Sequence, residues 1–352
     1  MRVGYVPHSK DLQHPADRRR LHSWASEKKN TLNIINPLES DILVLSNAAN
    51  FNYWIKRAKQ PVILDLVDGY LGENPSFLKD LVRNIVRTNR GSSNLHWITY
   101  TNHIRQACVM SDAVIVASSE QRDLILDLNK NIFVIPDNHA EIDSAVMTSG
   151  ATKSPALEQK IKNYIFWEGF GYTLKHFDFM AKELDQFLNE HNWGMYLVTN
   201  EVFPRWGGYI GKVQTKNLIK KKFPQSWSSI EIIPWSLQNL VEYASKSEFA
   251  IIPIDSSDKF GLMKSENKLL SMWHLKLATL ASPIPSYARI AEEIEMQEML
   301  IEPDNWYSSL STYANDKLHY IKLRSSSSAY LKENHTNLIL VEKWEQVLNS
   351  CI

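Results

Sequence analysis

The sequence predicts an α/β protein with two successive modules, each a parallel sheet covered by helices on both faces. Short, β-rich apolar runs recur along the chain, and helical patterns lie between them. Runs that are apolar throughout are typical of strands buried on both faces, as in parallel sheets. The 352 residues are enough for about two domains of ordinary size.

The first module alternates predicted strands with predicted helices. We expect strands at residues 2–6, 41–46, 61–66, 112–118 and 131–135. We expect helices at residues 15–29, 50–59, 75–90, 96–110 and 119–128. This alternation favours parallel strands, because the connection between two parallel strands is usually a helix.

A second module begins after a small, polar stretch at 144–157, which contains Gly and Pro and is predicted to be an interdomain linker. Its strands are expected at 163–167, 194–199, 230–233, 248–254 and 277–281. Its helices are expected at 174–191, 212–222, 236–246, 264–275 and 285–296. The predicted domains are therefore 1–150 and 151–330.

The C-terminal tail is predicted to be helical. In residues 337–349, Leu338, Val341, Trp344 and Leu348 share one helical face. We expect this helix, within residues 331–352, to pack back on the first module. The Ser325–Ser328 run predicts an exposed loop or a helix break.

Composition excludes several classes of protein. Lys plus Arg and Asp plus Glu both number 39, so the formal net charge is zero, and a non-specific nucleic-acid binder is not expected. Two cysteines are too few for a disulfide framework or a Cys-based zinc site. No apolar run is long enough for a bilayer span, and the N-terminus lacks the apolar core of a signal peptide. These features predict a cytoplasmic protein.

The polar loop after the first strand is a candidate site, since ligands of open α/β sheets bind at the carboxyl ends of strands. Asp11 and His14 are candidates to act on a proton or hydroxyl, and Arg18–Arg20 could bind an anion. The alternative is a helix start capped by Asp17 with arginines on the solvated face.

Asp65 and Asp68 lie at the end of another predicted strand. Two acids there could hold a metal, act as a base or cap the following turn, and the turn-and-cap interpretation is favoured. The helix at 75–90 has an apolar stripe and a basic side, so it could lie on an anionic membrane. The favoured alternative is an ordinary helix with its apolar side in the core.

Two loops of the second module are candidates for anion binding. Gly169 and Gly171 would allow a ligand close to the backbone, and Lys175 follows them. The loop 255–268 carries several lysines and acids, and together the two loops would form a two-sided anion pocket. Either loop alone is more simply a solvated turn.

Histidines give no metal motif in this sequence. No pair shows helical i, i+4 spacing with an acid, so no metal site is predicted. His139 follows a predicted strand end and would face a cleft, although a single histidine is more often a structural residue.

Several stretches together resemble the GT-B glycosyltransferases, and more closely the family-4-like members of bacterial capsule and lipopolysaccharide clusters. They are HPADRRR (14–20), SDAVIVASSEQ (111–121) with IPDN (135–138), WEGFGYTLKH (167–176) and KSENKLLSMW…LATLASPIPSY (264–287). The last is the most specific, being similar to the family's NKLLE-MA-G-P-V-S donor-loop pattern. The resemblance covers nearly the whole chain.

The resemblance implies two Rossmann-like domains facing a central cleft, with the C-terminal helix crossing back to the N-terminal domain. The acceptor would bind 1–150 and the nucleotide-sugar donor 151–330. Lys175 matches the family's diphosphate-binding Lys. Phe170 stands where the family usually has Arg, and Ser271 where it usually has the ribose-binding Glu.

The predicted site follows from these matches. Donor-binding residues are expected to be Gly169, Phe170, Gly171, Lys175, Lys264, Glu266, Asn267 and Lys268; acceptor-binding residues Arg18, Arg19 and His139; catalytic residues Asp11, His14 and Asp68. Lysines can neutralise a diphosphate, so neither a metal nor another cofactor is expected.

The leading hypothesis is a glycosyltransferase of bacterial surface polysaccharide biosynthesis that uses a saccharide or lipid-linked acceptor. Peripheral membrane contact through 75–90 would place it at the inner face of the cytoplasmic membrane. Two alternatives remain open: a nucleotide-sugar epimerase on the same fold, and a non-catalytic nucleotide-binding subunit.

Overall fold

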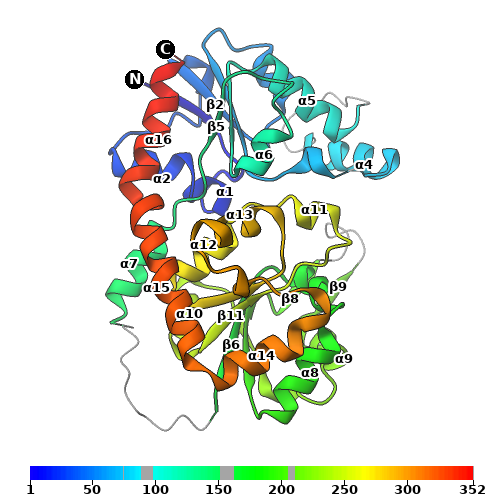
Figure 1. Cartoon of the computed structure of the whole chain (residues 1–352). Helices are drawn as coiled ribbons and strands as arrows, with labels where there is room; N and C mark the ends of the chain where they lie inside the picture. The colour runs from blue at the N-terminus through cyan, green and yellow to red at the C-terminus, as the bar shows by residue number, and fades with distance from the viewer. Residues whose placement is uncertain (74, 89–97, 151–161, 205–210, 352) are drawn as a thin grey trace. The chain divides into compact units, whose positions relative to one another are not determined.

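The computed structural model describes residues 1–73, 75–88, 98–150, 162–204 and 211–351, and the chain divides into two compact units (Figure 1). Unit 1 consists of Met1–Asn138, Leu262–Asn267 and His335–Ile352. Unit 2 consists of His139–Gly261 and Lys268–Asn334. Each unit contains its own parallel sheet, in agreement with the two modules expected from the sequence.

Unit 1 contains a parallel sheet in the order β1-β2-β3-β4-β5. Its strands are β1 (Val3–Val6), β2 (Ile42–Ser46), β3 (Val62–Leu66), β4 (Ala113–Val116) and β5 (Ile132–Val134). Its helices are α1 (Pro15–Arg18), α2 (Leu21–Glu27), α3 (Phe51–Ile55), α4 (Phe77–Thr88), α5 (Tyr100–Met110), α6 (Ser119–Asp123) and α16 (Asn337–Ser350), with short 3-10 helices η1 (Pro37–Glu39) and η2 (Tyr70–Gly72).

Strand β1 has a neighbour on each of its two sides: β2 on one side and the segment around Asn33 on the other. Before the chain enters β2, it forms a parallel bridge from Asn33 to Gly4 on the other side of β1. The Tyr5 amide donates to the Asn33 carbonyl at 3.0 Å, and the Asn33 amide donates to the Val3 carbonyl at 2.9 Å. The segments after β1 therefore run to both of its sides, which makes the end of β1 a topological switch point.

One face of this sheet is covered by α2 and α16, which lie side by side (Figure 1). Tyr5 and Val44 of the sheet, Trp24 of α2 and Trp344 of α16 belong to one buried apolar cluster. The predicted C-terminal helix is confirmed, and its apolar face completes the core of unit 1. Leu338, which was expected on that face, is exposed instead, because it lies in the first turn of α16, outside the buried cluster.

Unit 2 contains a parallel sheet in the order β10-β7-β6-β11-β12. The strands are β6 (Tyr164–Glu168), β7 (Gly194–Thr199), β10 (Ile230–Pro234), β11 (Phe249–Ile252) and β12 (Ala278–Ala281). A short antiparallel pair, β8 (Val202–Pro204) and β9 (Lys212–Gln214), follows β7. The strand order reverses at β6, which lies between β7 and β11, so the switch point of unit 2 is the end of β6.

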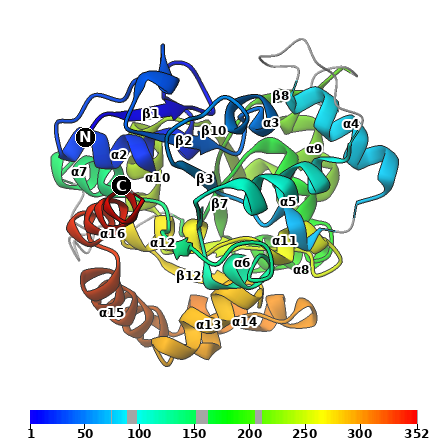
Figure 2. The same ribbon diagram turned by 90° about the horizontal axis from the view of Figure 1, so that it is seen from above.

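Helices surround the sheet of unit 2. They are α7 (Ala140–Thr148), α8 (Ala181–Glu190), α9 (Thr215–Lys222), α10 (Leu237–Lys246), α11 (Lys259–Leu262), α12 (Asn267–His274), α13 (Pro285–Glu293), α14 (Trp306–Asn315) and α15 (Lys317–Asn334), with 3-10 helices η3 (Gly171–Phe177), η5 (Trp227–Ser229), η6 (Gln297–Met299) and η7 (Pro303–Asn305). Helix α14 packs against α8 and leads into α15, which contacts β12 (Figures 1 and 2).

Two expectations about local structure are corrected. Residues 144–148 of the predicted linker belong to α7, and residues 151–157 lie outside the described residues. The Ser325–Ser328 run is neither loop nor break, because it continues α15, with Ser327 buried. Serine is only mildly unfavourable in a helix, and tertiary packing outweighs its propensity here.

None of the helices in the part of the chain that the structure describes is both long and apolar enough to cross a lipid bilayer.

Candidate functional site

The loop after β1 is organised by Asp17, whose side chain is fully buried. The Asp17 carboxylate accepts hydrogen bonds from the Tyr5 hydroxyl and the His8 amide, both at 2.7 Å, and from the Ser9 amide at 2.8 Å. Burial, followed by the charge of Asp17, raises the pKa of Tyr5 well above its usual value, so Tyr5 stays a donor. Asp17 therefore fixes the loop that carries Asp11 and His14.

Asp11 and His14 lie on this fixed loop. Asp11 is exposed and accepts from the Gln13 amide at 3.1 Å, which lowers the pKa of its carboxyl group. His14 caps α1, because its Nδ1 accepts from the Ala16 amide at 3.1 Å, and its ring stacks on His8 at 3.6 Å. With Nδ1 an acceptor, the other ring nitrogen carries the proton of neutral His14.

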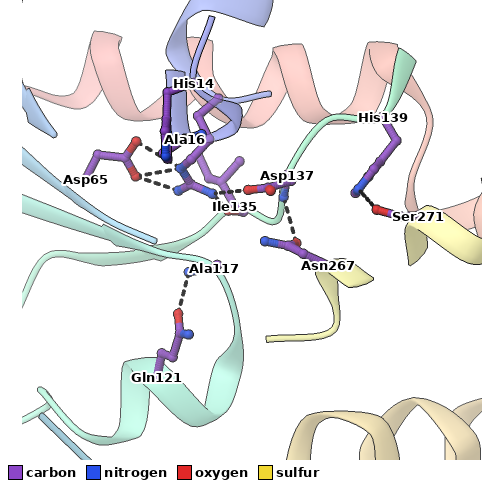
Figure 3. Close-up of polar contacts among 11 residues, drawn as sticks. His14, Ala16, Asp65, Ala117, Gln121, Ile135, Asp137, His139, Asn267 and Ser271 are labelled. Atoms are coloured by element: carbon purple, nitrogen blue, oxygen red, sulfur yellow. Dashed lines mark hydrogen bonds and ion pairs between the residues drawn. The ribbon is translucent and has the colours of Figure 1, made fainter. Parts of the chain in front are cut away.

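Arg20 does not belong to the expected anion-binding cluster. It is fully buried, and its guanidinium donates to Asp65 at 2.8 Å and to the Ile135 carbonyl at 2.8 Å (Figure 3). Asp137 lies 3.3 Å from the same group. Burial by itself lowers the pKa of Arg20, but the two carboxylates raise it above its usual value, so the guanidinium stays charged.

Asp65 was expected to cap a turn, and the structure instead places it in this buried ion pair. Arg18 and Arg19, the two predicted acceptor-binding arginines, are half-buried. The Nε of Arg18 donates to the Gln13 carbonyl at 3.2 Å, and the Arg19 carbonyl accepts from the Asn138 amide at 2.7 Å. Arg18 is therefore held against the loop after β1, whereas the backbone of Arg19 contacts the segment after β5.

Asp68 and Lys264 meet within unit 1. The Lys264 ammonium lies 3.7 Å from Asp68, and the Tyr70 hydroxyl donates to the same carboxylate at 3.2 Å. The segment around Lys264 is held by the Met263 carbonyl, which accepts from Gln121 at 3.2 Å. The structure thus pairs a predicted catalytic acid with a predicted donor-binding lysine.

Asn267 and Glu266 also belong to unit 1. Asn267 Oδ1 accepts from the Asp137 amide at 2.9 Å (Figure 3). Glu266 is buried, and its charge acts on Lys343 of α16, although burial dominates and lowers the pKa of that lysine. The predicted donor set is therefore divided, because Lys268 and the residues after β6 belong to unit 2.

Lys268 lies against the backbone at the switch point of unit 2. Its ammonium is 4.9 Å from the centre of the Trp167 ring. A Cβ atom on Gly169 would come within 2.8 Å of that ammonium and within 2.9 Å of Thr173 Oγ1. Gly169, which was predicted to allow a ligand close to the backbone, thus leaves room for the Lys268 side chain of the same unit.

The two loops expected to form an anion pocket do come together. Lys175, from the loop after β6, lies 2.6 Å from Asp258 in the loop after β11. His176 accepts from the Asp255 amide at 3.3 Å and lies 3.6 Å from Asp258. Partial burial raises the pKa of Asp258, but the hydrogen bond and charge of Lys175 outweigh this and lower it.

Gly171 and Phe170 have different environments. Gly171 is buried against the Phe203 ring of β8, where an added Cβ would come within 2.2 Å of a ring carbon. Phe170 is exposed, and its ring stacks on Tyr172. Gly171 therefore lets the loop pack against β8, while the Phe170 side chain projects into solvent.

His139 and Ser271 form a buried pair in unit 2, with 2.7 Å between Ser271 Oγ and His139 Nε2 (Figure 3). The ring of His274 stacks on the ring of His139, and a hydrogen bond of 2.8 Å joins His274 Nδ1 to Asp143 Oδ1. In the resembling family, the position of Ser271 is usually occupied by the ribose-binding Glu. Here Ser271 forms a hydrogen bond with His139 instead.

Three residues of these sites were missed or misread from the sequence. The sequence indicates only a helix cap for Asp17, does not distinguish Asp258 from the other acids of its loop, and gives no signal for His176. The available signal is their position in loops that follow strands, β1 of unit 1 for Asp17, and β6 and β11 of unit 2 for His176 and Asp258. Which side chains pair there depends on contacts between loops that are distant in sequence.

No protein-family model and no curated protein matches this sequence. Solved structures do match it. The structure of TarM has a TM-score of 0.60 at 12% identity over 88% of this chain and 54% of TarM. This chain thus spans about half the length of TarM.

Two further structures match with similar scores. The α,α-trehalose 6-phosphate synthase of Burkholderia multivorans has a TM-score of 0.57 at 10% identity, over 88% of this chain and 70% of that one. An α-glucosyltransferase in complex with UDP and DNA has a TM-score of 0.52 at 11% identity, over 88% and 81%. These matches confirm the predicted fold class, which is α/β with parallel sheets of the GT-B type.

Proposed function

We propose that this protein is a glycosyltransferase that moves a sugar from a nucleotide-sugar donor to a saccharide or lipid-linked acceptor. The carrying observation is the switch point of unit 2, where Lys175 and Lys268 lie beside a glycine-containing loop. Ammonium groups at the end of such a strand suit a diphosphate. The fold supports the proposal, since the α-glucosyltransferase with the same fold was solved with UDP.

The chemistry is a displacement at the anomeric carbon of the sugar. An acceptor hydroxyl oxygen forms the new bond, the bond to the diphosphate oxygen breaks, and negative charge grows on the diphosphate. Lys175 and Lys268 would stabilise that charge without a metal ion. The hydroxyl proton must go to a base, and the carboxylates of Asp11 and Asp68 of unit 1 are our candidates. His14, whose Nδ1 accepts from the Ala16 amide, is a candidate to orient the hydroxyl by donating from its other ring nitrogen.

We further propose a role in bacterial surface polysaccharide biosynthesis, at the inner face of the cytoplasmic membrane. This finer assignment rests on the sequence resemblance and on α4, which leaves Phe77, Leu78 and Val82 exposed. An exposed apolar stripe beside Lys79 suits an anionic lipid surface. Co-sedimentation with anionic vesicles tests it, and Leu78→Ser with Val82→Ser should abolish pelleting; wild type that never pellets contradicts it.

The main experiment is binding of nucleoside diphosphates by calorimetry, followed by transfer assays with a panel of nucleotide sugars. Lys175→Ala should weaken diphosphate binding about tenfold or more, because one of two ammonium contacts is lost. Lys182→Ala, an exposed lysine on α8, is the matched control and should leave binding unchanged. Equal affinities for wild type and Lys175→Ala would remove Lys175 from the site.

The same panel separates the two alternatives. An epimerase would convert the donor to its epimer with no acceptor present, which chromatography of the donor would reveal. A binding subunit would bind a nucleotide but transfer and epimerise nothing.

A further inference from the structure

Two aromatic side chains project from the loop after β6 as a stacked pair. The Phe170 and Tyr172 rings have centroids 5.5 Å apart and planes inclined by 8°. Phe170 is 49% exposed and Tyr172 is 60% exposed. Aromatic side chains of this size usually bury most of their surface, so two parallel exposed rings form a contact surface. We call this pair the aromatic platform.

The aromatic platform is fixed by its backbone. The Phe170 carbonyl accepts from the Thr173 amide at 2.8 Å and from the Thr173 hydroxyl at 2.7 Å. Gly171, which separates Phe170 from Tyr172 in the sequence, packs on Phe203 with no room for a side chain. A rigid aromatic surface loses little conformational entropy when a ligand binds it, so its position favours a binding role.

The position of the aromatic platform relative to Lys175 and Lys268 restricts the kinds of ligand that it could bind. Phe170 directly follows Gly169, whose Cα neighbourhood holds the Lys268 ammonium, and consecutive Cα atoms are about 3.8 Å apart. Lys175 lies further along the same η3 segment and is 57% exposed. A ligand with its anionic part at the ammonium groups would therefore have its adjoining part close to the loop that carries the rings.

We propose that the aromatic platform binds the sugar ring of the nucleotide-sugar donor, an inference that rests on the proposed function. The face of an aromatic ring is electron-rich and attracts the weakly positive C–H groups on the apolar face of a pyranose. In this chain a ring stands where the resembling family usually has Arg. An uncharged ring cannot form an ion pair with the diphosphate, so the side chain at position 170 suits the sugar that is attached to the diphosphate.

The test compares two ligands on the same variants. Affinities for a nucleoside diphosphate and for the nucleotide sugar that wild type binds best are measured by calorimetry for Phe170→Leu and Tyr172→Ala. Each variant should bind the nucleotide sugar about three- to tenfold more weakly and the diphosphate within twofold of wild type. Tyr172→Phe keeps the ring and should retain wild-type affinity for both ligands.

The matched control is Trp227→Ala. Trp227 is 40% exposed in the same unit, but it precedes β10 and so lies at the amino ends of the strands. It should change neither affinity. Thermal unfolding of the Phe170 and Tyr172 variants should match wild type, because both side chains are about half or more exposed.

Three outcomes would overturn the inference. If both ligands weaken equally, the rings stack on the nucleobase or ribose. If donor binding is unchanged and only the acceptor KM rises, they bind the acceptor sugar. If Tyr172→Ala matches wild type in all assays, they bind neither. Wild type that binds no nucleotide sugar would instead refute the proposed function itself.

Discussion

The two units carry the same kind of parallel sheet but use its carboxyl edge differently. In unit 1, Arg20, Asp65 and Asp137 satisfy one another beneath the surface, with Arg20 fully buried. In unit 2, Lys175, Phe170 and Tyr172 each have about half or more of the side chain exposed. Removing one partner of a buried ion pair leaves an uncompensated charge in the core, whereas exposed charge and aromatic surface are available to a ligand.

The largest effect is expected from breaking the buried network of unit 1. Arg20→Met leaves two buried carboxylates without their cation and should lower the free energy of unfolding by about 3–5 kcal/mol. Urea denaturation followed by circular dichroism measures it. Arg19→Met, the half-buried neighbour, should change stability by less than about 1 kcal/mol. Similar denaturation midpoints for the two variants would contradict a stabilising role for the network.

The next effect tests how the loop of unit 2 is packed. Gly171→Ala puts a Cβ within 2.2 Å of the Phe203 ring, so the loop or the ring must move. Overpacking of this kind costs about 1–3 kcal/mol in the free energy of unfolding. Phe203→Ala removes the clashing ring, so the double variant should be no less stable than Phe203→Ala alone. An additive loss in the double variant would show that the strain lies elsewhere.

Lys268 should show the opposite behaviour to Arg20. Lys268→Met keeps the length of the side chain but removes its charge, and should weaken nucleoside diphosphate binding about tenfold, or about 1.4 kcal/mol. Thermal unfolding should change little, since Met can still pack on Trp167. A large loss of stability with unchanged binding would make Lys268 a structural residue like Arg20.

The smallest effect concerns the Lys175–Asp258 pair. Because Lys175 lowers the pKa of Asp258, the carboxylate stabilises the fold above its ordinary pKa of about 4, and this contribution is lost as pH falls through the lowered value. Asp258→Asn should therefore cost less than about 1 kcal/mol at pH 7, since Lys175 is exposed, and the difference should shrink below about pH 4.

Denaturation of wild type and Asp258→Asn at several pH values measures this difference. Asp304→Asn, a change at an exposed acid in η7, controls for the altered net charge. A difference between wild type and Asp258→Asn that grows towards acid pH would show the opposite sign of linkage.

The strands were predictable because their signal is local. The strands of both parallel sheets fall within the stretches expected from their apolar runs, as for VILDL of β3 and FAII of β11. The exceptions are β6 and β10, which each end one residue later than expected. The β8–β9 pair was missed, because its three-residue strands carry no such run. The serines of α15 were misread, because the pattern of four polar residues hides a helix that packing against β12 supports.

The candidate site was only partly predictable. Gly169 and Lys175 follow a strand at the position where a ligand loop belongs, and the sequence shows that position. Arg18, Arg19 and Arg20 are indistinguishable as letters, yet only the last is buried. Burial depends on where β3 and β5 bring Asp65 and Asp137, which no local pattern reveals.

The sequence by itself determined the two α/β modules, the helical C-terminus and the loops in which charged residues gather, because alternation of strand and helix patterns is a property of neighbouring residues. The tertiary structure decided which charges neutralise each other. It paired Arg20 with Asp65, Lys264 with Asp68 and Lys175 with Asp258, residues that are 45, 196 and 83 positions apart. Pairing at such separations requires the sheets to bring strand ends together, and that geometry exists only in the folded chain.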